Sequence, residues 1–151
     1  MKRVLFLCIG NSCRSPMAEA FARAYGSDVM EPLSAGLAPA YIIQPLTKQV
    51  MEAKNISLEG LYAKDLGAID LTTVDLIVNM SNRPLPPGIP VEVREWRVED
   101  PIGQDEETYI AVRDQIERLV MGLILDLRRA KRPAKRAPSL RTLLRGSGTD
   151  V

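Results

Sequence analysis

Apolar residues along this chain form short continuous runs that alternate with stretches in which apolar positions recur every three or four residues. Continuous runs are typical of strands covered on both faces of a parallel sheet, whereas the wider spacing indicates helices that face a core. The alternation predicts an α/β fold, a three-layer sandwich with a central four-stranded parallel sheet and helices on both faces. The predicted strands cover residues 4–8, 29–36, 75–80 and 91–96, and the predicted helices follow Ser15, cover residues 42–55 and begin at about Glu106.

The first predicted helix has recognisable end signals. Ser15 can cap its N-terminus, Pro16 suits its first turn and Gly26 is a stop signal. The helix follows closely on the strand that ends at Cys8. Ligands of parallel α/β sheets bind beyond the carboxyl ends of the strands, so functional residues are expected in this junction.

Composition limits the chemistry that the chain can perform. Its 151 residues include no histidine and two cysteines. The lack of histidine excludes Ser-His and Cys-His catalytic pairs, and two cysteines alone make a weak metal site, so we expect no metal and no cofactor. No membrane span or signal peptide is expected, and the two cysteines do not suggest a disulfide framework, which together predict a cytoplasmic protein.

Charge is divided unevenly along the chain. Residues 1–127 hold 12 Lys and Arg against 18 Asp and Glu, whereas residues 128–151 hold 8 Lys and Arg and one Asp. Prolines and clustered bases replace the apolar pattern from Arg128 onward. We therefore predict a folded domain over residues 1–128 and a basic, flexible tail over residues 129–151, with docking of that tail on an acidic partner as the alternative.

The junction between the first strand and the first helix reads CIGNSCRS. A turn of this kind can point successive backbone N–H groups into one concavity, where the helix dipole adds positive potential. Gly10 and Asn11 tolerate the positive φ angles that such a turn requires, and the guanidinium of Arg14 can bind two oxygens of a tetrahedral anion. The predicted anion site comprises Ile9, Gly10, Asn11, Ser12, Cys13, Arg14 and Ser15.

Cys8 stands at the mouth of this predicted anion site. The helix terminus, Arg14 and a hydrogen bond from the Ser15 hydroxyl would all favour its thiolate over its thiol. Cys8 is therefore a candidate nucleophile, and the alternative is a small buried residue at a strand end.

Cys8, five intervening residues and then Arg14-Ser15 resemble the phosphate-binding loop of the low-molecular-weight protein tyrosine phosphatases and the related thioredoxin-linked arsenate reductases. Ser34-Ala35-Gly36 and Asp100-Pro101 extend the resemblance, which covers roughly residues 3 to 127. It implies that the first 128 residues form a catalytic domain of this type. It also implies that Cys8 attacks phosphorus, that the loop amides and Arg14 hold the oxygens, and that Asp100 is the general acid and base.

The resemblance leaves the reaction open. Our first prediction is a phosphatase that hydrolyses phosphate monoesters, such as protein phosphotyrosine or a small phosphoester, through a cysteinyl-phosphate intermediate. The alternative is an arsenate reductase that uses an external thiol, because Asn79–Gly88 lacks the further cysteines that the thioredoxin-linked reductases carry there. Ile102 and Gly103 also stand where the phosphatases place aromatic residues, although Tyr41 could supply one wall and Tyr109 is expected in the core. A second alternative is a non-catalytic anion-binding or phosphocarrier module.

Cys13 is a redox-regulatory candidate by the same resemblance. In the tyrosine phosphatases its position can form a reversible disulfide with the nucleophile, which would switch off activity and protect the thiolate. The alternative is a small residue that only lines the loop.

Overall fold

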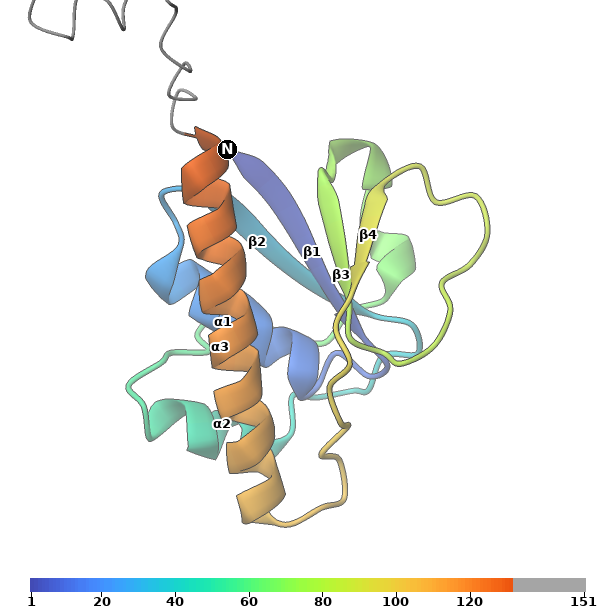
Figure 1. Cartoon of the computed structure of the whole chain (residues 1–151). Coiled ribbons are helices and arrows are strands. Elements are labelled where there is room, and N and C mark those ends of the chain that lie inside the picture. The colour runs from blue at the N-terminus through green and yellow to red at the C-terminus, as the bar shows by residue number, and fades with distance from the viewer. Residues whose placement is uncertain (132–151) are drawn as a thin grey trace, which may run out of the picture.

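The computed structural model describes residues 1–131, and its centre is a parallel sheet of four strands (Figure 1). The strand order is β2-β1-β3-β4, with all three pairs parallel. The four predicted strands are confirmed to within two residues at each end. Their bounds are Lys2–Cys8 for β1, Met30–Gly36 for β2, Leu76–Asn79 for β3 and Glu92–Glu95 for β4.

Helices cover both faces of the sheet, which confirms the predicted three-layer sandwich. The helices α1 (Arg14–Tyr25), α2 (Pro45–Glu52) and α3 (Glu106–Lys131) lie on one side. The other side carries two short 3-10 helices, η1 (Leu66–Ala68) and η2 (Leu71–Thr73). Asp65 and Asp70 cap these short helices by accepting hydrogen bonds from the N–H groups two residues further on.

The central strand β1 divides the core into two apolar clusters. Val4 and Phe6 belong to the cluster beneath α1 and α3, whereas Leu5 and Leu7 belong to the cluster beneath η1 and η2. Side chains alternate between the faces of a strand, so a strand covered on both faces must be apolar at every position. Cys8 ends the strand and belongs to neither cluster.

The ends of α1 differ from the prediction at one terminus and agree at the other. The N-cap residue is Cys13, which makes no side-chain capping bond, and Gly26 is the C-cap. Ser15 is therefore not the cap that we predicted. It lies in the first turn and is fully buried, because its hydroxyl is used in the loop beneath it.

The last helix continues past the predicted domain boundary at residue 128. The guanidinium of Arg128 binds both carboxylate oxygens of Asp28 at 2.9 Å, and Lys131 Nζ donates to the Asp28 carbonyl at 2.9 Å. The hydrogen bond from Arg128 lowers the pKa of Asp28. Residues 129–131 are thus helical, and the rest of the predicted tail lies outside the described residues. No helix in the described part has the length and apolar character that a bilayer crossing needs.

Gly36 brings the end of β2 against the junction loop. It pairs in register with Cys8, and a Cβ at this position would lie 2.6 Å from the Ile9 carbonyl oxygen and 2.9 Å from the Asn11 nitrogen. Because both neighbours are backbone atoms, they cannot move aside without moving the loop. Only glycine fits here without displacing residues 9–11.

We expect Gly36→Ala to lower the free energy of unfolding by about 1–3 kcal/mol, because overpacking against backbone forces a shift. Urea denaturation measures this loss. The control is Gly122→Ala in α3, where an added Cβ meets nothing within 4 Å. This substitution should raise the free energy of unfolding by about 0.5–1 kcal/mol, because alanine favours the helix more than glycine does. Equal stability of the Gly36→Ala variant and the wild type would contradict the close approach.

Candidate active site

The loop of residues 8–13 runs from the carboxyl end of β1 to the start of α1 (Figure 1). Its carbonyls bind outward to the segment after β2: those of Cys8, Ile9 and Gly10 accept from the N–H groups of residues 37, 38 and 40. The N–H groups of residues 10–13 donate to no group in the described part of the chain. A loop with its carbonyls engaged outward and its N–H groups free is suited to hold an anion.

Asn11, and not Gly10, has the positive φ angle of this loop. The φ of Asn11 is 50°, whereas Gly10 is absent from the positive-φ residues. The Asn11 side chain fixes this conformation, because its Oδ1 accepts from the Lys64 N–H at 3.0 Å and its Nδ2 donates to Ser15 Oγ at 2.8 Å. The prediction of positive φ is confirmed for Asn11 and wrong for Gly10.

The Cys8 sulfur lies beneath the loop and faces a hydroxyl group. Its Sγ is 3.0 Å from Ser15 Oγ. Asn11 Nδ2 donates to the same oxygen at 2.8 Å, and the Ser15 hydroxyl also lies 3.4 Å from the Ala35 carbonyl, to which it can donate. Cys8 is only 2% exposed, and the Ser15 hydroxyl is a direct polar contact of its sulfur.

Arg14 is buried, and one edge of its guanidinium is bound to backbone carbonyls. It is 1% exposed, and its Nη1 donates to the carbonyls of Met80 and Val98. Its Nε has no hydrogen-bond partner in the described residues. Nε and Nη2 form the fork that binds two oxygens of a tetrahedral anion, and an unsatisfied buried donor of this kind is uncommon in proteins.

Asp100 lies at the same fork. Its Oδ2 is 3.4 Å from Arg14 Nη2, its side chain is 38% exposed, and its Oδ1 accepts from the Ile102 N–H at 3.1 Å. Two residues earlier, the Val98 carbonyl holds the other edge of Arg14. The structure therefore brings Arg14 and Asp100 together although they are far apart in the sequence. Acid and base catalysis by Asp100 stays a prediction.

Cys13 does not join Cys8, Arg14 and Asp100, because its side chain belongs to the larger apolar cluster. Its sulfur is 3.6 Å from the Tyr109 hydroxyl and 3.7 Å from Ser12 Oγ. Burial raises the pKa of the Cys13 thiol, and it raises the pKa of Tyr109 as well. Both cysteines are free thiols here, and redox regulation through Cys13 stays a prediction.

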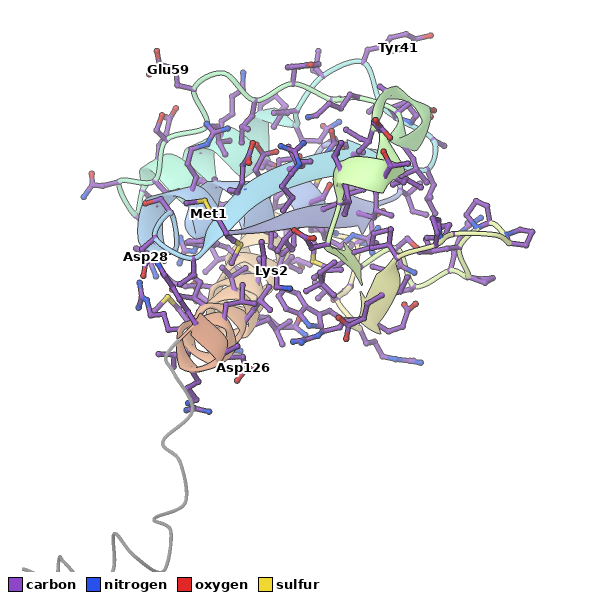
Figure 2. All side chains as sticks on the ribbon, turned by 90° about the horizontal axis from the view of Figure 1, so that it is seen from above. Met1, Lys2, Asp28, Tyr41, Glu59 and Asp126 are labelled. Carbon is purple, nitrogen blue, oxygen red and sulfur yellow. The ribbon has the colours of Figure 1, made fainter. Side chains whose placement is uncertain are left out.

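The aromatic side chains near the loop do not form a closed wall. Tyr41 is fully exposed and projects into solvent at the edge of the molecule (Figure 2). Tyr109 is 2% exposed, which confirms its expected place in the core. Ile102, which stands where the phosphatases place aromatic residues, is exposed.

Several residues that support the site were not found from the sequence. Ser34 donates to the buried carboxylate of Glu19 at 2.5 Å, which ties β2 to α1, and Thr47 Oγ1 donates to the Ser12 carbonyl at 2.9 Å. Ser34 had been noted as part of Ser34-Ala35-Gly36, but nothing in the sequence indicated that its hydroxyl binds Glu19. The carbonyls of Met80 and Val98, which bind Arg14, could not be found from the sequence, because every residue has a backbone carbonyl.

The strand-end cysteine, the loop N–H groups without partners in the described residues and the buried arginine at the helix start together form a loop suited to bind an oxyanion. A family model described as low molecular weight phosphotyrosine protein phosphatase matches residues 3–86. The chain belongs to this family.

The relatives that it resembles include both reductases and phosphatases. The glutaredoxin arsenate reductase of Synechocystis sp. is 33% identical over 129 residues, which cover 82% of this chain and 97% of that protein. The structure of an arsenate reductase in the phosphate binding state has a TM-score of 0.78 at 31% identity and covers 84% of this chain and 99% of that one. The YwlE arginine phosphatase from Geobacillus stearothermophilus has a TM-score of 0.76 at 25% identity, with coverage of 87% and 96%.

We expect Arg14→Lys to bind inorganic phosphate at least about 10-fold more weakly, because lysine keeps the charge but loses the two-pronged donor edge. Isothermal titration calorimetry at constant ionic strength measures the affinity. The control is Arg113→Lys, since Arg113 also donates to a backbone carbonyl, that of Val50, but lies outside the loop. Unchanged phosphate affinity of the Arg14→Lys variant would show that the fork is not the anion site.

Proposed function

We propose that this protein is an arsenate reductase that takes its electrons from an external thiol. The observation that carries the proposal is the unpartnered Nε of buried Arg14 in the loop that begins at Cys8, a donor set suited to a tetrahedral oxyanion. The relatives support reduction of arsenate, our sequence-based alternative, more than hydrolysis of phosphate esters, our first prediction.

The first step joins Cys8 to arsenic. The Cys8 thiolate attacks As(V), an S–As bond forms, and one As–O bond breaks. The departing oxygen leaves as water after it takes up protons, one of them from Asp100. The loop N–H groups and the Arg14 fork hold the remaining oxygens, whose charge they stabilise through hydrogen bonds that are already in place.

The second step reduces the arsenic. An external thiolate attacks Cys8 Sγ, and the electron pair of the S–As bond stays on arsenic, which leaves as arsenite. Cys8 is then in a mixed disulfide with the external thiol, and a second external thiolate attacks the outer sulfur and releases the Cys8 thiolate. In total, one arsenate and two thiols give one arsenite, one disulfide and one water.

The second thiol must come from outside because the chain offers no suitable internal one. Its cysteines are Cys8 and Cys13 only. Cys13 faces Tyr109 in the apolar cluster, and burial raises its pKa, so at neutral pH it is a protonated thiol and a poor nucleophile. Electron supply from outside also agrees with the name of the Synechocystis relative, a glutaredoxin arsenate reductase.

We expect Cys8→Ser to abolish arsenite formation with glutathione and glutaredoxin, whereas Cys13→Ser still forms arsenite, because the Cys13 sulfur takes part in no electron-transfer step. Arsenite is measured directly, and oxidised glutathione should accumulate at one equivalent per arsenite. Lack of arsenite with glutathione, glutaredoxin, thioredoxin and dithiothreitol alike would refute the proposal.

Hydrolysis of phosphate monoesters is a second candidate, favoured by the Asp100 carboxylate 3.4 Å from Arg14. Hydrolysis needs a group that first protonates the leaving oxygen and then activates water, and Asp100 stands close enough to an anion on the Arg14 fork for both tasks. The Cys8 adduct would then be broken by water instead of a thiol.

If the protein hydrolyses esters, Asp100→Asn should reduce kcat by roughly 10²- to 10⁴-fold on phenyl phosphate, the usual contribution of a positioned acid. The loss should be smaller on para-nitrophenyl phosphate, whose leaving group needs less protonation. Comparison of the two substrates measures this difference. An equal loss on both would argue that Asp100 acts only by holding Arg14.

A further inference from the structure

A hollow of about 400 Å³ opens at the carboxyl ends of β3 and β4, outside the loop that holds Cys8. We call it the arginine hollow, because two arginines line it. Its lining residues are Asn82, Arg83, Pro84, Glu95, Trp96 and Arg97.

The arginine hollow and the active site share one carbonyl group. Asn82 Nδ2 donates to the Val98 carbonyl at 2.8 Å, and Arg14 Nη1 donates to the same oxygen at 3.1 Å. Met80, two residues before Asn82, binds Arg14 through its carbonyl and donates its N–H to the Leu7 carbonyl at 2.8 Å. The segment that lines the hollow is therefore anchored both to the catalytic arginine and to the residue before Cys8.

The charges in the hollow favour an anionic ligand. Arg83 and Arg97 are exposed, and neither has an ion-pair partner within residues 1–131. Glu95, the acidic residue of the lining, accepts a hydrogen bond from Asn79 Nδ2 at 3.2 Å. Two unpaired guanidinium groups on one small hollow match a ligand with carboxylates, because each fork binds a carboxylate through two hydrogen bonds.

Trp96 gives the hollow a fixed apolar wall. Its ring centroid is 6.0 Å from that of Phe6, which is buried in the core, so the indole position is set by packing. An indole face beside two arginines can pack against a short peptide backbone or methylene chain while its carboxylates reach the guanidinium groups.

We propose that the arginine hollow binds the external thiol itself, a small carboxylate-bearing thiol of the glutathione class. The carboxylates lie on Arg83 and Arg97, the peptide packs on Trp96, and the sulfur is directed past Asp100 toward Cys8. This inference rests on the proposed arsenate reductase activity, whose second step requires such a thiol. Arsenate and thiol then occupy neighbouring sites, with the anion on the Nε edge of Arg14 and the thiol beyond the Val98 carbonyl.

Binding can be measured without turnover, because Trp96 is the only tryptophan of the chain. S-methylglutathione, which has the carboxylates but no reactive thiol, is titrated into the Cys8→Ser protein while Trp96 fluorescence is followed. We expect a saturable change, and a Kd about 3- to 10-fold higher when Arg83→Gln and Arg97→Gln are combined, since partly exposed ion pairs are lost. The control combines Lys48→Gln and Arg129→Gln, which removes the same charge from exposed positions outside the hollow.

Turnover gives a second and separate measurement. We expect the ratio of kcat/KM with glutathione to kcat/KM with dithiothreitol to fall about 3- to 10-fold in the double arginine variant and to stay constant in the control, because dithiothreitol has no carboxylates. The ratio cancels any defect in steps that both thiols share.

The outcomes distinguish this inference from the proposed function. No saturable change with S-methylglutathione, or equal weakening in both double variants, overturns the assignment of the hollow even if arsenite forms. A tyrosine-phosphorylated peptide is titrated in the same way. If this peptide changes Trp96 fluorescence through Arg83 and Arg97 whereas S-methylglutathione does not, the assignment is overturned in favour of a peptide substrate. If S-methylglutathione binds as expected but no thiol supports arsenite formation, the hollow is a glutathione site and the proposed activity fails.

Discussion

The buried guanidinium of Arg14 is the interaction on which the rest of the site depends. A buried cation is costly unless it is fully hydrogen-bonded, and this one is held by the carbonyls of Met80 and Val98. Those carbonyls follow β3 and β4, whereas Arg14 begins α1. One side chain therefore joins the segments after two strands to a helix start, while its Nη2 faces Asp100 and its Nε has no partner in the described residues. The sheet order places these elements side by side, so the fold itself creates the cation site.

A second set of contacts fixes the loop around Cys8. Gly36 allows backbone to approach backbone, the carbonyls of the loop bind the segment after β2, and Asn11 links the Lys64 N–H to the Ser15 hydroxyl. With its carbonyls turned outward, the loop has its N–H groups free for the ligand. Preorganised donors of this kind need no rearrangement when negative charge develops, which suits a phosphate ester and arsenate equally.

The layers of the fold and the loop from Cys8 to Ser15 could be predicted from the sequence, because both depend on patterns among neighbouring residues. Continuous apolar runs, helix-spaced apolar residues and the loop from Cys8 to Ser15 can be read from neighbouring positions. Contacts between distant positions could not be predicted in this way. The carbonyls that hold Arg14 have no sequence signature, and neither has the contact between the Thr47 hydroxyl and the Ser12 carbonyl. The hollow brings Arg83, from a proline-rich turn after β3, together with Trp96 and Arg97, which follow β4, and this pairing has no local pattern.

The balance between hydrolysis and reduction is set by access of the second reactant to Cys8 Sγ. Water can break a cysteinyl adduct when Asp100 accepts its proton, but reduction needs a sulfur that approaches in line with the S–As bond. Cys13 does not meet this requirement, because its sulfur is 3.6 Å from the Tyr109 hydroxyl within the apolar cluster and its pKa is raised by burial. In the proposed redox cycle, the chain would supply one of the three sulfur atoms, that of Cys8. Under the proposed reduction, specificity would lie in how the protein binds a thiol, and Arg83 and Arg97, which have no ion-pair partner within residues 1–131, would supply a physical basis for that binding.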